Sequence, residues 1–456
     1  MAVFDHFDDD DPPPLPNDHS EDDVRRFRDL LRNGGKDINN PEALEEIIQF
    51  YFEHDKFEEA LQYSDRLISF EPFSSDAWQR KGMILNNMTR YEDALSCYDR
   101  AVSLNPTDPE IFINRGITLD NMERVDEAMT SFEHAIELDP SNEEAMFHRA
   151  VTLEKEERYE EAVDIFQQVL TINPDHADVW YELGYCYDFL EKLEDSVRCY
   201  DEHLNRDPYN FNGWYNKGIV LNRMGQFSRA VESYEYALAI KEDFPSAWYN
   251  LGNAYANLGR LHDAVQCYKT TIKYEDGDIP AWHNLGNAWE ELGDYVQAQE
   301  CYDETLKRDS KHHESMFGKG CCYDATGDTA RALECYAAAA EMAPDAPEYW
   351  YACGDAEYNL GHVEGSLRYY ERVLDLQPDN AEAWYDYGDT LLEMGRDEKA
   401  LYALQKSVEL SPKFAQALHS LGRALERVGR IDEGLQALER AYLLMPELRR
   451  PPDEKK

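Results

Sequence analysis

A phrase of the sequence recurs at a constant interval of 34 residues along most of this 456-residue chain. The segment "AWYNLGNAYANLGRLHDAVQCY", which begins at Ala247, returns 34 residues later as "AWHNLGNAWEELGDYVQAQECY" from Ala281. Counted in this register, twelve units fit between Pro41 and Glu447 without an insertion or a deletion. A period of this length predicts a repeat architecture, in which each unit buries its apolar face against its neighbours.

Certain positions of the unit carry the same kind of side chain throughout. The fourth residue is always large and apolar: Leu44, Trp78, Phe112, Met146, Trp180, Trp214, Trp248, Trp282, Met316, Trp350, Trp384 and Leu418. The eighth residue is glycine in ten units: Gly82, Gly116, Gly184, Gly218, Gly252, Gly286, Gly320, Gly354, Gly388 and Gly422. The twentieth residue is small, the twenty-fourth is mostly aromatic, and the thirty-second is proline in nine units. We expect the fourth and twenty-fourth side chains to be buried between helices.

Each unit has the pattern of two helices. In residues 245–258, large side chains recur at spacings of three and four, on one helical face: Trp248, Leu251 and Tyr255. Gly259 is expected to end this helix in the left-handed conformation, and a second helix is expected near residues 261–274. Small residues such as Gly252 and Ala264 are expected where the two helices approach each other closely.

The pattern W-x2-L-G-x2-Y, followed by A-x3-F and then P, resembles the tetratricopeptide repeat (TPR) family. The resemblance covers about nine-tenths of the chain. It implies an all-α fold, a right-handed superhelical solenoid of about twelve 34-residue helix–turn–helix (TPR) repeats, with the first helix of each repeat on the concave face. Three units, which end at Glu242, Asp276 and Ser310, lack the proline. We expect shallower or more variable packing around these three.

The ends of the chain differ from the repeats. Residues 1–20 are acidic and proline-rich and are predicted to be a disordered tail. Residues 21–40 are predicted to form an N-terminal capping helix and linker, because Val24, Phe27, Leu30 and Leu31 recur at helical spacing. The twelve TPR units then occupy residues 41–448, and residues 449–456 are predicted to be a disordered C-terminal tail with no further helix to cover the last unit.

The charge balance narrows the choice of partners. The chain carries 45 basic and 93 acidic side chains, for a formal net charge of −48. A nucleic-acid-binding surface needs lysine and arginine to neutralise phosphates, so no nucleic acid is expected. Docking on an anionic membrane surface is disfavoured for the same reason. The excess of acid would attract a basic partner. It could also serve only to keep the protein soluble in a salt-rich cytoplasm.

Neither a cofactor nor a targeting signal is indicated. Five of the nine cysteines precede a tyrosine at intervals that are multiples of 34, which indicates a structural slot: Cys97, Cys199, Cys267, Cys301 and Cys335. No C-x-x-C pair occurs, so neither a metal nor a cofactor is expected. The N-terminus has no basic and apolar signal regions, and no apolar run is long enough to span a membrane. A cytoplasmic location is therefore expected.

Asparagines recur at positions that, on the TPR pattern, face the groove. The sixth residue is Asn114, Asn216, Asn250 or Asn284 in four units, and the ninth is Asn253 or Asn287 in two. A carboxamide offers both a donor and an acceptor, so a row of them can hold the backbone of an extended peptide whatever its sequence. The alternative is that these asparagines bond to neighbouring helices of the same chain.

Aromatic side chains form a second row at the fifth position, and five of them are candidates for partner contacts: Tyr181, Tyr215, Tyr249, Tyr351 and Tyr385. Carboxylates such as Glu154, Asp355 and Asp389 lie nearby in the unit. A groove of this composition suits an extended segment that bears lysine or arginine. No fifth residue is basic, so capture of an acidic C-terminal tail by a carboxylate clamp is not expected.

The sequence offers no catalytic motif. No G-x-x-x-x-G-K-[ST], H-E-x-x-H or G-x-S-x-G occurs, and the protein is expected not to be an enzyme. The main hypothesis is a protein–protein interaction scaffold that binds an extended, basic peptide segment or partner protein in the concave groove. The alternatives are a structural component that self-associates through its C-terminal repeat, and an accessory subunit of an enzyme complex.

Overall fold

The computed structural model of this protein describes residues 41–449. The predicted N-terminal tail and capping helix therefore lie outside the described residues, as do residues 450–456 of the predicted C-terminal tail. The chain divides into two compact units, Met1–Val220 and Leu221–Lys456, each of which we describe by itself.

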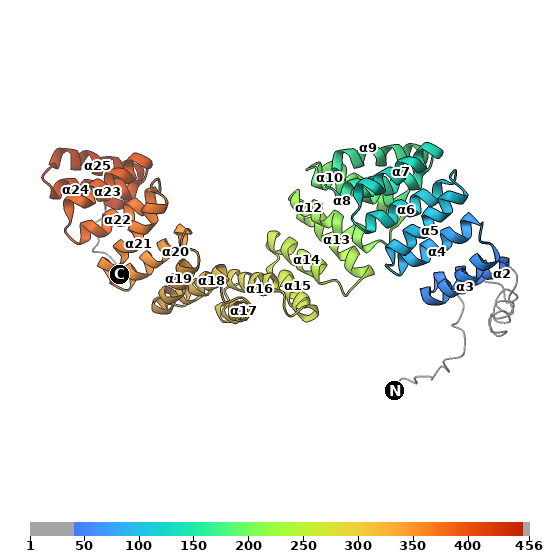
Figure 1. The fold of residues 1–456 in the computed structure, drawn as a ribbon. Helices are drawn as coiled ribbons and strands as arrows, with labels where there is room; N and C mark the ends of the chain where they lie inside the picture. Colours follow the sequence, from blue (N-terminus) through green and yellow to red (C-terminus); the bar gives the residue numbers. More distant parts are fainter. Residues whose placement is uncertain (1–40, 450–456) are drawn as a thin grey trace, which may run out of the picture. The chain divides into compact units, whose positions relative to one another are not determined.

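Two kinds of α-helix alternate along residues 41–449 (Figure 1), and no strand occurs among them. The first helices of the repeats are α2 (Pro41–Glu53), α4 (Ser75–Asn87), α6 (Pro109–Asn121), α8 (Glu143–Lys155), α10 (Ala177–Phe189), α12 (Phe211–Arg223), α14 (Pro245–Asn257), α16 (Ile279–Glu291), α18 (His313–Ala325), α20 (Pro347–Asn359), α22 (Ala381–Glu393) and α24 (Ala415–Arg427). The second helices are α3 (Phe57–Phe70), α5 (Tyr91–Leu104), α7 (Val125–Leu138), α9 (Tyr159–Ile172), α11 (Leu193–Arg206), α13 (Phe227–Ile240), α15 (Leu261–Tyr274), α17 (Tyr295–Arg308), α19 (Thr329–Met342), α21 (Val363–Leu376), α23 (Asp397–Leu410) and α25 (Ile431–Leu444). A short 3-10 helix, Pro446–Arg449, follows α25.

Successive helices pack against each other within each compact unit, as α4 does with α5 and α14 with α15. First helices of neighbouring repeats also touch: α4 contacts α6, α6 contacts α8, and α16 contacts α18. The predicted all-α solenoid of twelve helix–turn–helix repeats is confirmed. The three units without the terminal proline are no exception, because α14, α16 and α18 each begin at the first position of their repeat, as the others do.

The glycine at the eighth position makes room for the aromatic ring at the twenty-fourth. A Cβ atom built on Gly252 would lie 2.6 Å from Cε1 of Tyr268, and one on Gly116 would lie 2.5 Å from Cε1 of Phe132. Tyr268 and Phe132 are almost fully buried. The eighth residue is therefore small because a ring from the second helix lies against its backbone, which refines the expectation that Gly252 marks a general close approach of two helices.

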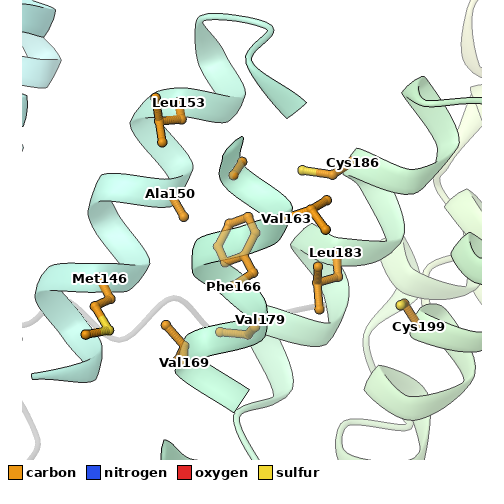
Figure 2. Packing of buried hydrophobic residues seen from close by; sticks show 11 residues of the cluster. Met146, Ala150, Leu153, Val163, Phe166, Val169, Val179, Leu183, Cys186 and Cys199 are labelled. Atoms are coloured by element: carbon orange, nitrogen blue, oxygen red, sulfur yellow. The ribbon is translucent and has the colours of Figure 1, made fainter. Parts of the chain in front are cut away.

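The core is continuous from one repeat to the next. Figure 2 shows side chains of α8, α9 and α10 converging, with Phe166 of α9 between Ala150 of α8 and Leu183 of α10. Phe166 and Ala150 are completely buried, and Leu183 is nearly so. Because each second helix packs on the first helices on both of its sides, removal of one large ring weakens two helix–helix contacts.

The turn inside each repeat has a left-handed residue after the first helix. Gly259 has a φ of 70°, and the other glycines predicted at this place also have positive φ: Gly225, Gly293, Gly327, Gly361, Gly395 and Gly429. The first five repeats adopt the same conformation without glycine, as Thr89 does with a φ of 57°. The helix end is thus set by packing of the repeat, and glycine only lowers the local strain.

The fourth-position tryptophans were expected to be buried, and this expectation is wrong in part. None of them is fully buried; each is of intermediate exposure. In all seven, the indole Nε1 donates a hydrogen bond to the backbone carbonyl six residues earlier, at 2.8 to 3.1 Å: Pro72, Pro174, Pro208, Glu242, Asp276, Pro344 and Pro378. The carbonyls of Glu242 and Asp276 accept this bond as the prolines do, which explains why their repeats keep the common geometry.

Replacing Trp350 by phenylalanine is expected to lower the free energy of unfolding by about 1 kcal/mol, because the hydrogen bond to the Pro344 carbonyl is lost while most of the ring remains. Trp289 offers a matched control, since its buried Nε1 has no hydrogen-bond partner. Trp289→Phe should be nearly neutral. Urea-induced unfolding followed by circular dichroism measures both, and equal losses would show that the indole hydrogen bond does not hold the loop.

Candidate functional site

The predicted binding residues lie on the first helices of the repeats, and they are half-buried or exposed. Tyr181 lies on α10, Tyr215 and Asn216 on α12, and Tyr249 and Asn250 on α14, all of them half-buried. Because the first helices of neighbouring repeats touch each other, side chains on this face of one repeat can reach those of the next.

The fifth residue of one repeat is hydrogen-bonded to the sixth residue of the following repeat. Asn216 Nδ2 donates to the Tyr181 hydroxyl at 2.8 Å, and Asn284 Nδ2 donates to the Tyr249 hydroxyl at 3.0 Å. The structure therefore brings together the two rows that the sequence predicted separately. These bonds also fit the alternative interpretation of the asparagines, since each one ties two neighbouring repeats.

The ninth-position asparagines bond to tyrosines of the second helices. The Tyr268 hydroxyl donates to Asn253 Oδ1 at 2.8 Å, and the Tyr302 hydroxyl is 2.8 Å from Asn287 Oδ1. Asn284 Nδ2 also donates to Asn253 Oδ1 at 3.0 Å, so this carboxamide is part of a chain of hydrogen bonds across two repeats. The chain fixes the orientation of the amides before any ligand binds.

One predicted residue takes no part in these links. Asn114 donates from Nδ2 to the Glu110 carbonyl of its own helix at 3.0 Å. Tyr351 follows the pattern, because its hydroxyl is hydrogen-bonded to the carboxylate of Asp386 at the sixth position of the next repeat. Tyr385 follows it too: its hydroxyl is hydrogen-bonded to Ser420, the sixth residue of the next repeat, and its ring packs against Phe414 with ring centroids 5.0 Å apart.

A carboxylate occupies the sixth position in three of the units that lack asparagine there, and the sequence analysis missed two of these carboxylates, Glu182 and Asp386. Glu182 of α10 and Glu154 of α8 are hydrogen-bonded to each other, and burial raises the pKa of both carboxyl groups. The Cys186 thiol lies 3.6 Å from Glu154 Oε2. The position in the repeat could have identified Glu182 from the sequence, because Glu182 stands 34 residues before Asn216 and therefore has the same position in its unit.

A second acidic group lies on α20 and α22. Burial raises the pKa of Asp386 to about 6 and also raises the pKa of Asp355, whose carboxylate accepts a hydrogen bond from Tyr370 at 2.8 Å. Asp389 accepts one from Ser420 Oγ at 2.6 Å. A cation that approaches protonated or partly desolvated carboxyls of this kind stabilises their charged form, so its binding beside them is favourable.

Among residues 41–449, no group of three or more His, Cys, Asp and Glu side chains is placed to hold a metal ion. Within the same residues, no helix combines the length and the apolar character that crossing a membrane requires.

Family models of one kind match the chain along most of its length. Models described as "Tetratricopeptide repeat" match residues 153–210, 245–276, 283–347, 323–365, 351–415 and 415–440. A model described as "TPR repeat" matches residues 220–259, and one described as "Psidin, N-terminal TPR repeats region" matches residues 48–149. No curated protein matches the chain.

Solved structures of similar fold include those of the proteins MamA and YrrB. The crystal structure of MamA is 25% identical and covers 36% of this chain and 95% of its own, with a TM-score of 0.34. The crystal structure of YrrB, described as a TPR protein with an unusual peptide-binding site, is 21% identical and covers 42% of this chain and 98% of its own, with a TM-score of 0.37.

Proposed function

Because this chain belongs to the tetratricopeptide repeat family, we propose that it is a non-enzymatic scaffold that binds an extended, basic segment of a partner protein on the face formed by its first helices. TPR repeats serve generally as protein-interaction modules. The proposal concerns the surface that is used and the chemistry of the segment that it binds.

The observation that carries the proposal is the fixed orientation of the amides. Both Nδ2 hydrogens of Asn284 are engaged, one by the Tyr249 hydroxyl and one by Asn253 Oδ1. The Asn284 Oδ1 atom remains able to accept a peptide N–H, and the Tyr249 hydroxyl, which accepts from Asn284, retains its own hydrogen for a peptide carbonyl. An acceptor and a donor on one rigid frame match the two polar groups of a peptide unit.

The charges support a basic segment. The amide-rich repeats have acidic groups along the chain on either side, with Glu154 and Glu182 in one compact unit and Asp355, Asp386 and Asp389 in the other. A lysine or arginine near these carboxyls would relieve their mutual repulsion, and the long-range field would speed association at low salt. Since the frame is ordered beforehand, few of its side chains lose freedom on binding.

Replacing Asn216, Asn250 and Asn284 together by alanine is expected to weaken partner binding by about 100-fold, at roughly 1 kcal/mol for each amide. An affinity pull-down at low and high salt, followed by titration of the partner that it isolates, measures this. Retention of the same partners at unchanged affinity would contradict the proposal.

The matched control replaces the buried Tyr268 and Tyr302 by phenylalanine. This variant loses the hydrogen bonds to Asn253 and Asn287 but keeps every amide of the row and the Tyr249 hydroxyl. Its loss of stability should be similar to that of the alanine variant, and its loss of affinity should be clearly smaller. Equal affinity losses in the two variants would mean that loosened stacking, rather than missing amides, weakens binding.

A second candidate function is self-association through α25. Leu443 and Leu435 of this helix are 83% and 50% exposed, whereas Val265 and Leu367, at the position equivalent to Leu435, are buried. Apolar side chains at this position are covered by the following helix in other repeats, so a second copy of the protein could cover them. Sedimentation of the wild-type protein and of Leu443→Glu distinguishes the two candidates, because only self-association depends on Leu443.

A further inference from the structure

Consecutive second helices border an outer groove whose floor is the first helix between them, and ion pairs cross this groove in five repeats. In each pair, the base is the seventh residue of a repeat and the acid is the twenty-fifth residue of the preceding repeat. The pairs are Lys81–Asp65 at 2.7 Å, Arg115–Asp99 at 3.3 Å, Arg149–Glu133 at 3.1 Å, Lys217–Asp201 at 2.5 Å and Lys319–Asp303 at 2.6 Å.

Two of these lysines also lie over the fourth-position tryptophan of their own repeat. The Lys217 ammonium lies 4.8 Å from the centroid of the Trp214 ring, and the Lys81 ammonium lies 5.8 Å from that of Trp78. The groove therefore holds an ammonium between an indole face and a carboxylate, a combination that attracts a cation both through the ring quadrupole and through charge.

The acid and the base vary together along the chain. In the other repeats after the first, the seventh residue is Leu183, Leu251, Leu285, Cys353, Tyr387 or Leu421, and the twenty-fifth residue before it is Gln167, Glu235, Lys269, Ala337, Glu371 or Gln405, respectively. The Tyr387 hydroxyl takes the place of the ammonium, since it donates to Glu371 Oε1 at 2.6 Å. Only the repeat that begins at Pro245 combines a carboxylate, Glu235, with an apolar seventh residue, Leu251.

A cavity of about 560 Å³ lies at this place, between α13 and α15 and over α14. Its lining includes the Trp248 indole and the side chains of Leu251 and Tyr255, together with three acidic residues, Glu235, Glu242 and Asp263. The cavity lies at the seventh position of the repeat, where Leu251 stands in place of a lysine such as Lys217.

The charged groups around the cavity leave it negative. Asp263 is paired with Arg260 at 2.7 Å, and the Arg260 guanidinium lies over the Tyr255 ring, 4.3 Å from its centroid. Glu235 accepts a hydrogen bond from the Tyr255 hydroxyl at 2.6 Å through Oε1, which leaves Oε2 to bind a cation. The Glu242 carboxylate has a long contact of 3.5 Å from the Tyr274 hydroxyl.

We propose that this cavity is a binding site for a lysine side chain of a partner protein, with the ammonium held between the Trp248 indole and the Glu235 carboxylate. The partner's lysine supplies the group that Lys217 and Lys81 supply within the chain in their own repeats. The site lies in the outer groove, not on the amide row of the first helices, so it goes beyond the proposed peptide-binding face and can fail or succeed independently of it.

The test uses the full chain labelled with 5-fluorotryptophan, n-butylammonium chloride as the probe, and fluorine NMR as the readout. The Trp248 signal is identified from its loss in Trp248→Phe. We expect it to shift saturably with the probe, in the millimolar range, and not with n-butanol in sodium chloride of the same ionic strength. The Trp214 signal is the internal control and should not shift, because Lys217 already occupies its ring face.

Three variants test the site further. Glu235→Gln is expected to weaken the response of Trp248 about five- to tenfold. Leu251→Lys should abolish it, because the new ammonium fills the site as Lys217 does. Lys217→Leu should confer a response on Trp214, because it removes the ammonium that lies over this indole and pairs with Asp201, and the probe can supply that group instead. The proposal is overturned if Trp248 shifts equally with n-butanol, if Trp214 of the wild-type protein shifts as much, or if Glu235→Gln leaves the response unchanged. Glu235→Gln keeps the test valid should Leu251→Lys fail to fold.

Discussion

Replacement of Tyr268 by alanine is expected to lower the free energy of unfolding by about 3–5 kcal/mol, the usual cost of deleting a buried aromatic side chain. Tyr268 is 2% exposed, its ring lies against the backbone of Gly252, and its hydroxyl donates to Asn253. The loss is measured by urea denaturation and localised by hydrogen exchange, which should increase most in α14 and α15.

Two controls separate the ring from the hydroxyl and from the helix backbone. Tyr268→Phe should cost only about 1 kcal/mol, because Phe132 and Phe166 occupy the same position in their repeats without a hydroxyl. Gly252→Ala should cost about 1–3 kcal/mol in the wild-type protein through overpacking, since its Cβ would meet the ring at 2.6 Å. In the Tyr268→Ala background the same change should cost much less. Strictly additive losses would show that the ring does not depend on the missing Cβ.

The sequence was sufficient to predict the solenoid because the same kinds of side chain recur at the same positions in nearly every repeat. Gly252 and Tyr268 stand at fixed places in a unit that recurs with no change of length, so local pattern and stacking agree. The left-handed turn was also predictable at Gly259. It was not predictable at Thr89, which adopts the same conformation because packing of its repeat overrides its own preference.

The spacing of apolar residues could not predict that the indole N–H of each fourth-position tryptophan donates a hydrogen bond to a backbone carbonyl. The spacing of Trp248 shows which way the ring points, but the hydrogen bond from Nε1 to the Glu242 carbonyl depends on the path of the loop between repeats. Apolar periodicity identifies the face of a helix and does not distinguish full burial from an indole that covers a loop and keeps one edge in water.

The sequence predicted the candidate site as two separate rows of side chains. The hydrogen bonds that join the two rows could be identified only from the three-dimensional structure. Tyr249 and Asn284 are 35 residues apart, so their hydrogen bond depends on how one repeat is rotated on the next. The sequence search followed asparagine and therefore missed Glu182 and Asp386, which fill the same position with a carboxyl group. The position in the repeat, rather than the residue type, was the more general guide.

Raising the pH from about 5 to about 9 is expected to destabilise the compact unit that contains Glu154 and Glu182 by about 2 kcal/mol, after allowance for solvent screening. Burial is the main cause that raises the pKa of both carboxyls above the ordinary glutamate value of 4.5. The charge and the hydrogen bond of Glu154 raise the pKa of Glu182 further, whereas the hydrogen bond with Glu182 partly offsets the rise at Glu154. The folded state therefore binds protons more tightly than the unfolded state. The stabilising contribution is fully present below pH 4.5 and is lost as the pH rises through the raised values.

Glu182→Gln should remove most of this dependence and stabilise the protein at high pH, because the Glu154 carboxylate then faces a neutral amide donor in place of a second charge. Glu160→Gln, at an exposed position of α9, makes the same change of net charge and should leave the slope as in the wild-type protein. Urea denaturation at several pH values, with hydrogen exchange in α8 and α10, measures the three proteins. A parallel pH dependence in all three would mean that general repulsion among the acidic side chains, and not this pair, governs stability. If the pair does govern it, a basic ligand bound beside it should reduce the loss at high pH, because a neighbouring cation favours the charged carboxylates.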